Sequence, residues 1–197
     1  MVILLSFTAS TGTGVRMDER REWVGSTAWY VAPRQAGERD AWSEELAASG
    51  RRGAQRLREV AETTPPPEVE AALGLSPGEP VVVRRRTMLV DDQPVELTDS
   101  YYPRSVAAGT GLASPGKIRG GAPTLLAELG YVADEVVEDL SVRPALPAEA
   151  RDLALPGGAL VISLIRTSST ADGVPFEVSV MVMRPEGRHF RYRLKAS

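Results

Sequence analysis

The chain has 197 residues, of which 43% are hydrophobic and 25% are charged, a composition that allows one globular domain with a sizeable core, or one domain with an appendage. The absence of cysteine excludes disulfides, thiolate zinc sites and cysteine nucleophiles, and the single histidine, His189, excludes a multi-histidine metal site. The formal net charge of −3 provides no global positive field to draw the protein to nucleic acid.

Residues 1–56 are expected to form an N-terminal extension or arm. Its opening run, Met1–Phe7, is too short for the apolar region of a signal peptide and lacks a basic start. No apolar run in the chain approaches the ~20 residues of a membrane span. We therefore expect a cytoplasmic protein without membrane contact. Trp23, Trp29 and Tyr30 can anchor the arm onto another surface, and a weak strand is expected around Ser26–Val31.

Apolar residues recur at helical spacing from Glu38 to Val60, although Gly50 and Gly53 divide the run. This pattern places a helix near residues 38–56. The following domain is expected to cover residues 57–197.

Beyond residue 60, short helices that end at glycine or proline are interspersed with β-branched strands joined by tight turns. In chain order, the expected elements are a helix at Glu68–Leu73, strands at Val81–Val90 and Pro94–Tyr102, helices at Ser105–Leu112 and Pro123–Leu129, a strand at Val136–Arg143, a helix at Pro147–Leu153, and strands at Ala159–Ser169, Val174–Met183 and Arg188–Leu194. The last three strands are expected to form an antiparallel meander. Hairpin connections favour an α+β fold, an antiparallel sheet of about six strands with packed helices, over a doubly wound parallel sheet.

Most catalytic signatures are missing from the sequence. There is no phosphate-binding loop with lysine, no dinucleotide fingerprint after a strand and no nucleophile elbow. His189 is expected to be a surface histidine on an edge strand rather than a general base. No cofactor and no metal are expected.

Three consecutive arginines on one expected strand are the most informative polar feature. Arg84 and Arg86 should share one face of the strand, and Arg85 should take the other. A guanidinium on an inner face needs anionic or carbonyl partners, from the protein or from a ligand. The candidate carboxylates are Glu96, Glu138 and Glu177. The sequence alone is compatible with a structural Arg–Glu pair within the sheet and with an arginine that contacts a ligand.

The hairpin at Glu79–Pro103 resembles the first hairpin of UTRA domains, the effector-binding modules of the HutC branch of GntR transcription regulators. Three further stretches resemble the family in the same order: Pro65–Leu75, Leu125–Gly130 and the closing meander from Leu160 to Leu194. The resemblance implies a chorismate-lyase-like fold, a homodimer, and a ligand pocket between the sheet and its helices. A complete regulator would begin with a winged helix-turn-helix. Residues 1–56 do not resemble one, so we expect no direct DNA binding.

The resemblance also implies the residues of the pocket. Sugar-phosphate sensors of the family carry two arginines on the first strand, a glutamate on the second, and a glutamate followed by a tyrosine on the last hairpin. Arg86 and Glu177 match the first arginine and the last glutamate, whereas the other three positions hold Met88, Thr98 and Met183, which makes the pocket less polar unless the methionines only fill the core. The expected ligand-binding residues are Arg86, Met88, Thr98, Ser100, Arg166, Glu177 and Met183.

Three functions follow as hypotheses. The first is a ligand-binding regulatory module whose ligand is apolar with one carbonyl or carboxylate end, read by Arg86. The second is a stand-alone enzyme on the same fold, with Arg86 and Glu177 polarising a carbonyl or moving a proton on an apolar substrate. The third is a protein-interaction module that uses the tryptophan-bearing N-terminus as an arm. The fold alone does not choose among them.

Overall fold

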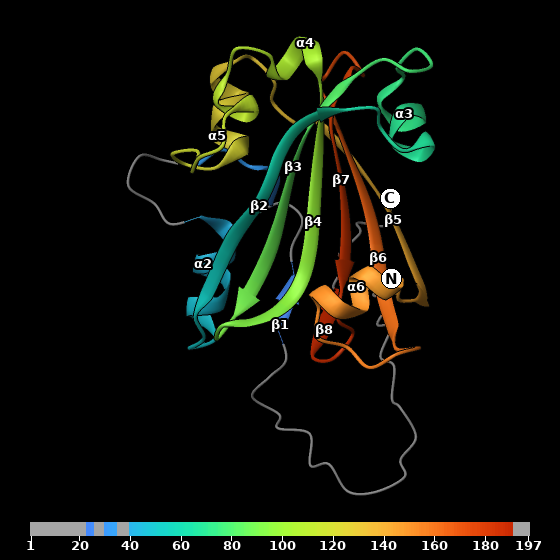
Figure 1. Cartoon of the computed structure of the whole chain (residues 1–197). Helices are drawn as coiled ribbons and strands as arrows, with labels where there is room; N and C mark the ends of the chain where they lie inside the picture. The colour runs from blue at the N-terminus through green and yellow to red at the C-terminus, as the bar shows by residue number, and fades with distance from the viewer. Residues whose placement is uncertain (1–22, 26–29, 35–39, 191–197) are drawn as a thin grey trace, which may run out of the picture.

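Six strands form one antiparallel sheet in the order β2-β3-β4-β7-β6-β5 (Figure 1). Figure 1 is a computed structural model that describes residues 23–25, 30–34 and 40–190. The strands of the large sheet are β2 (Gly53–Thr63), β3 (Val81–Val90), β4 (Gln93–Pro103), β5 (Glu135–Pro144), β6 (Leu160–Ser169) and β7 (Pro175–Met183). Two short strands, β1 (Trp23–Gly25) and β8 (Arg188–Phe190), pair in parallel outside this sheet. The α+β fold with a six-stranded antiparallel sheet is confirmed.

Short helices cover both faces of the sheet. They are α2 (Ala41–Ala48), α3 (Pro67–Leu73), α4 (Arg104–Ala107), the 3-10 helix η2 (Gly111–Ala113), α5 (Ala122–Glu128) and α6 (Pro147–Asp152). Buried residues of α2, α4, η2 and α5 pack on one face, and those of α3 with residues flanking α6 pack on the other. Strand side chains alternate between these two faces.

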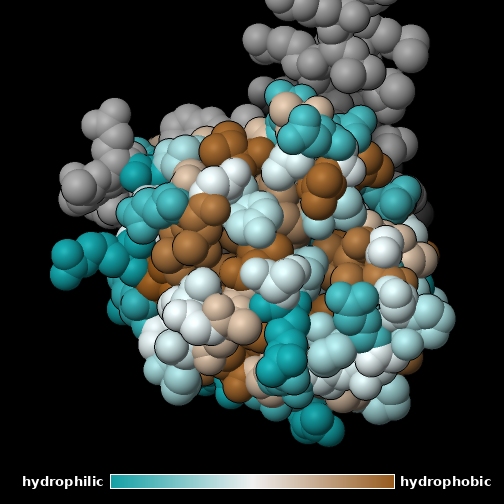
Figure 2. Space-filling model, turned by 90° about the horizontal axis from the view of Figure 1, so that it is seen from above, coloured by the Kyte–Doolittle hydropathy of each residue, from teal (hydrophilic) through white to brown (hydrophobic). Residues whose placement is uncertain are grey.

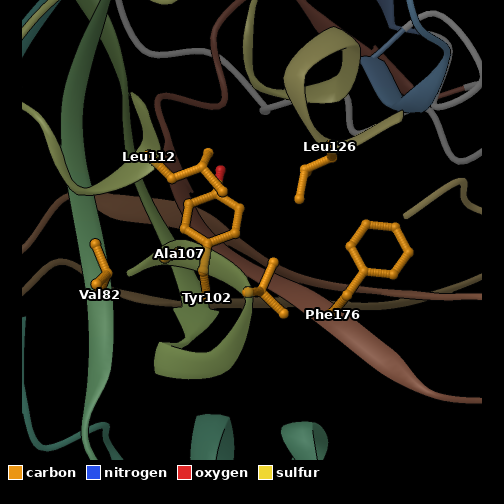
Figure 3. Packing of buried hydrophobic residues seen from close by; sticks show 7 residues of the cluster. Val82, Tyr102, Ala107, Leu112, Leu126 and Phe176 are labelled. Carbon is orange, nitrogen blue, oxygen red and sulfur yellow. The ribbon is translucent and has the colours of Figure 1, made fainter. Parts of the chain in front are cut away.

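The alternation is clearest on β3, at the centre of the covered region. Val82 joins a cluster with Tyr102 of β4 and Leu112 of η2 (Figure 3). Val81 and Val83 instead pack beside α3. We call the face that carries Val82, Arg84, Arg86 and Met88 the Arg86 face, and the opposite one the Arg85 face. Both sides of β3 are buried near its start, which explains its continuous apolar run.

The β3–β4 hairpin has the turn that its sequence predicts. Asp91 and Asp92 have φ angles of 48° and 64°, the left-handed pair that a two-residue hairpin requires. The Asp91 carboxylate accepts hydrogen bonds from the Arg52 backbone N–H (2.9 Å) and from Arg51 Nε (3.0 Å). These bonds tie the start of β2 to the hairpin.

The helix expected near residues 38–56 is wrong in its second half. Helix α2 ends at Ala48, Gly50 follows with φ 70°, and residues from Gly53 onward form β2. A β-bulge between Leu57 and Glu59 places Leu57 opposite Arg86 and Val60 opposite Arg84, so both point to the same face. The three-residue spacing that suggested a helix is therefore produced by a bulged strand. The boundary expected after residue 56 lies within β2.

The closing meander is also wrong in its last strand. The described part of that strand, β8, pairs with β1 rather than with β7. Strand β7 already has β4 and β6 as neighbours, so neither of its edges is open to a third strand. Of the strand expected around Ser26–Val31, residues 26–29 lie outside the described residues, and Tyr30 and Val31 are helical. The other expected helices and strands are confirmed to within a few residues, except that Ser105–Leu112 divides into α4 and η2.

Candidate functional site

Seven residues singled out from the sequence lie on four adjacent strands and share the Arg86 face. Arg86 pairs in register with Thr98, and Ser100 with Ser179, which in turn lies opposite Arg166. The seven are Arg86 and Met88 on β3, Thr98 and Ser100 on β4, Arg166 on β6, and Glu177 and Met183 on β7. Residues that lie directly opposite each other on paired antiparallel strands point to the same face of the sheet. The registers of β3, β4, β7 and β6 place all seven residues on one face in this way.

A chain of hydrogen bonds crosses this face from Arg86 to Glu177. Arg86 Nη2 donates to Ser100 Oγ (2.7 Å), which is 2.8 Å from Ser179 Oγ. Ser179 Oγ donates to Glu177 Oε1 (3.1 Å), and Tyr102 Oη donates to the same oxygen (3.1 Å). Burial raises the pKa of Tyr102, and the Glu177 carboxylate raises it further, so the phenol stays a donor. The two serines let this chain reorganise at little cost because their hydroxyls rotate.

Arg86 has hydrogen-bonding capacity that its described neighbours leave unused. Its Nε is buried, and no residue in the described ranges accepts a hydrogen bond from it. A buried donor without an acceptor costs free energy that an oxygen atom of a ligand would recover. The Arg86 guanidinium can therefore donate a hydrogen bond to a carbonyl or carboxylate oxygen of a ligand.

Arg166 has its charge neutralised within the protein. Its Nε and Nη2 both lie 2.7 Å from Glu138 Oε1 of β5. The Arg166 guanidinium also lies 5.8 Å from the ring centroid of Tyr30. Because Arg166 is already ion-paired with Glu138 and lies near the Tyr30 ring, it is better placed to pack beside a ligand than to bind an anion.

Residues 30–34 cross the Arg86 face between two helices. Tyr30 Oη donates to the Glu45 carboxylate of α2, and burial raises the pKa of Tyr30. Arg34 forms an ion pair with Glu44 of α2, and its backbone N–H donates to Thr124 Oγ1 of α5 (2.9 Å). This segment joins α2 to α5 above the sheet.

The two methionines lie in apolar clusters on the same face. Met88 is 6% exposed and packs with Trp42 and Leu46 of α2, whereas Met183 is 2% exposed and packs with Ile162 and Leu164. They form the apolar part of the face, and their role toward a ligand stays a prediction.

The carboxylates considered as partners for the arginine triplet have other partners. Glu138 pairs with Arg166, and Glu96 pairs with Arg188 (2.7 Å) while accepting from Thr98 Oγ1 (2.7 Å). Glu177 is engaged by hydroxyl groups, as described above.

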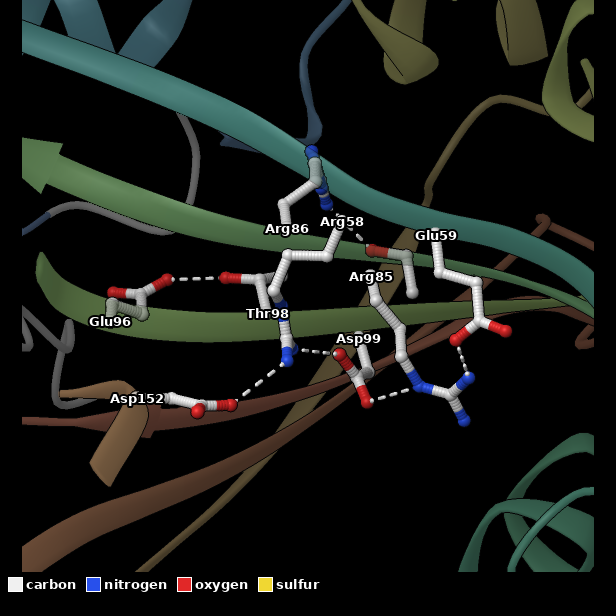
Figure 4. Close-up of polar contacts among 9 residues, drawn as sticks. Arg58, Glu59, Arg85, Arg86, Glu96, Thr98, Asp99 and Asp152 are labelled. Atoms are coloured by element: carbon white, nitrogen blue, oxygen red, sulfur yellow. Dashed lines mark hydrogen bonds and ion pairs between the residues drawn. The ribbon is translucent and has the colours of Figure 1, made fainter. Parts of the chain in front are cut away.

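Arg85 points to the opposite side of the sheet from Arg86, as the alternation predicts (Figure 4). Arg85 contacts Asp99 (3.1 Å) and Glu59 (2.6 Å), and Arg58 contacts Asp99 (3.0 Å) and Asp152 (3.5 Å). Burial raises the pKa of Asp99 even though the guanidinium groups of Arg58, Arg85 and Arg86 oppose that shift. The Arg85 face thus carries a self-contained ion-pair network.

The sequence did not single out Ser179 or Tyr102, and it predicted Tyr30 only as an anchor of the N-terminal arm. Ser179 could have been found from strand register, because it lies directly opposite Ser100 on the neighbouring strand. Tyr30 contacts α2 and β6 from an arm with no periodicity, so no local signal predicted its position.

Figure 2 shows the molecule from above, with hydrophobic side chains among the polar ones at the surface. A separate hollow of about 380 Å³ lies beside the turn between β6 and β7. It is lined by Gly130, Tyr131, Val132, Thr170, Ala171, Asp172 and Val174. No basic side chain is among them, so this hollow suits an acidic ligand less well than the Arg86 face does. Within the described ranges, no group of three His, Cys, Asp or Glu side chains could hold a metal ion. No described helix is both long enough and apolar enough to cross a membrane.

Known proteins are similar to this chain in sequence and in fold. The UTRA domain family matches residues 48–187. A helix-turn-helix transcriptional regulator of Streptomyces coelicolor is 30% identical over 184 residues, which cover 91% of this chain and 68% of the relative. A second such regulator, from Mycobacterium tuberculosis, is 33% identical over 140 residues, which cover 68% of this chain and 49% of the relative. The chain therefore spans only part of these regulators.

Among solved structures, the effector domain of PhnF from Mycobacterium smegmatis has the same fold, with a TM-score of 0.67 at 20% identity. The alignment covers 84% of this chain and 99% of that domain. The family match covers more than half of the chain and agrees with the four stretches that carry the resemblance in the sequence. The chain thus belongs to the UTRA domain family, the effector-binding domain of GntR-type transcription regulators.

Proposed function

We propose that the Arg86 face binds an apolar small molecule through one carbonyl or carboxylate end, and that this binding is the regulatory input of the domain. The observation that carries the proposal is the buried Arg86 Nε, for which the described residues offer no acceptor. Ser100, Ser179 and Glu177 continue the polar surface beside it, and Met88, Thr98 and Met183 give the less polar remainder. The regulators matched by the chain give no support to the enzyme hypothesis.

Calorimetric titration tests this proposal. Octanoate and benzoate represent apolar acids, and glucose 6-phosphate represents sugar phosphates. We expect an apolar acid to bind more tightly than the sugar phosphate, and Arg86→Ala to weaken that binding by roughly 2–4 kcal/mol, because one charge-assisted contact is lost. Arg104→Ala is the control, since Arg104 lies on α4 with its side chain 61% exposed. Preference for glucose 6-phosphate, or an Arg86→Ala variant that is less stable but binds with unchanged affinity, would contradict the proposal.

We further infer that the domain acts as a homodimer in the cytoplasm, joined along β5. Among the strands of the described residues, β5 is the last in the sheet order and has one neighbour, β6. Val137, Leu140 and Val142 of β5 are 50%, 39% and 47% exposed. An unpaired edge that also exposes apolar side chains favours pairing with a second copy. The closing strand β8 is less suited to this role, because it already pairs with β1.

A further inference from the structure

Arg84 is a buried arginine that is solvated by backbone carbonyls. It lies on the Arg86 face and is only 5% exposed. Its Nη1 donates to the carbonyl oxygens of Gly111 (3.2 Å), Leu112 (2.9 Å) and Ser114 (2.8 Å), and its Nη2 donates to that of Gly116 (2.7 Å). Burial lowers the pKa of this guanidinium, and the charge of nearby Arg86 acts in the same direction. Four converging carbonyl dipoles hold the cation in place of a carboxylate.

The segment that supplies these carbonyls has little regular structure. It contains the single turn η2, whose backbone bonds run from Ala113 N to Thr110 O and from Ser114 N to Gly111 O. Buried carbonyls need donors, and the planar fork of one arginine can satisfy several at once. Leu112 of the same segment is fully buried against Val82 and Tyr102 (Figure 3). Arg84 and Leu112 therefore fix residues 111–116 to the sheet by a polar and an apolar contact.

The fixed segment continues into the elements above the candidate site. Gly120 and Gly121, with φ of 75° and 85°, turn the chain into α5. Thr124 Oγ1 donates to the Gly120 carbonyl (2.8 Å) and accepts from the Arg34 backbone, in the segment that crosses the Arg86 face. Residues 111–116 are thus connected through the chain to α5, and α5 is bonded through Thr124 to residues 30–34.

We propose that Arg84 is a positioning residue of the ligand site, whose guanidinium latches residues 111–116 over the end of the Arg86 face beside Arg86. Release of the latch frees this segment and uncovers that end of the site. The regulatory meaning of the latch rests on the proposed function, but the latch itself is measurable without a ligand.

Lysine-specific proteolysis of the full chain tests the latch. The chain contains two lysines, Lys117 and Lys195, and Lys117 is exposed and directly follows the latched segment. A lysine-specific protease cuts at Lys117 only when the surrounding backbone opens to enter its active site. We expect Arg84→Met to be cut at Lys117 on the order of tenfold faster than the unmodified chain. Arg84→Lys, which keeps a cation but not the fork, should fall between the two.

Two controls separate the latch from general destabilisation. Arg85→Met removes the neighbouring guanidinium on the opposite face and should leave cleavage at Lys117 unchanged. Val161→Ala weakens a core cluster on the Arg85 face, away from residues 111–116. Its cleavage rate at Lys117 is compared with that of Arg84→Met under conditions in which both variants have the same free energy of unfolding. Cleavage of Arg84→Met no faster than that of stability-matched Val161→Ala would overturn the latch, and Arg84→Lys serves for this comparison if Arg84→Met does not fold. The assay contains no ligand, so calorimetry with Arg86→Ala decides the proposed function separately.

Discussion

Three consecutive arginines on one strand have three different environments. Arg84 is held by carbonyls, Arg85 belongs to an ion-pair network, and Arg86 keeps a buried donor without a described acceptor. Composition could not distinguish them, since all three have the same side chain. Strand alternation separates Arg85 from the other two, but the difference between Arg84 and Arg86 depends on residues 111–116, about 30 positions away in sequence. Strand alternation alone thus leaves Arg84 and Arg86 as candidates for a ligand contact, and the resemblance to the family selects Arg86.

Gly53 is another residue whose role depends on a tertiary contact. A Cβ at this position would lie 2.9 Å from the backbone oxygen of Trp42 and 2.8 Å from Leu46 Cδ1. We expect Gly53→Ala to lower the free energy of unfolding by about 1–3 kcal/mol, because α2 must move away from the start of β2. Urea denaturation measures the change. Gly157→Ala is the control, as its Cβ would meet no atom within 4 Å, and an equal loss in both variants would contradict the explanation.

Among the helices and strands, the sequence predicted those whose structure is determined by residues close to one another in the chain. The β3–β4 hairpin was predictable because its turn residues, Asp91 and Asp92, and the proline that ends its second strand, Pro103, are adjacent to the strands in sequence. Strand β2 was not, because its bulge gives Leu57 and Val60 a helical spacing. The pairing of β8 was not either, because it depends on β7 having both edges occupied by strands from elsewhere in the chain.

The exposed edge of β5 leads to a prediction at this scale. Val142→Lys should convert a dimer of the 21.2 kDa chain into a monomer, because a charge at the edge strand opposes pairing with a second copy. Light scattering at tens of micromolar protein measures the mass. Val174→Lys, in the β6–β7 turn, replaces a valine that is 54% exposed, against 47% for Val142, and should remain dimeric. A monomeric unmodified chain at the same concentration would refute the proposed interface.

In the whole molecule, one sheet separates two kinds of polar chemistry. The Arg85 face satisfies its charges in ion pairs. The Arg86 face also has ion pairs, at Glu138 and Glu96, but adds a chain of hydroxyls between Arg86 and Glu177. Helices α2 and α5, joined by residues 30–34, lie above the second face. The family could be predicted from four stretches of sequence, but the partners of each arginine required the packed structure. This division favours the Arg86 face as the place where a small molecule acts on the domain.

Nuclear magnetic resonance of the arginine Nε–H groups tests this account most directly, because it observes the unsatisfied donor itself. The Arg86 signal is assigned with Arg86→Lys, and octanoate is titrated into the unmodified chain. We predict that the Arg86 Nε–H signal shifts with a saturating dependence on octanoate, as expected when the donor gains a carboxylate acceptor. The Arg85 signal should stay in place, since its Nε already donates to Asp99 (3.1 Å). An Arg86 signal that does not move while octanoate binds, or equal shifts at both arginines, would contradict the account.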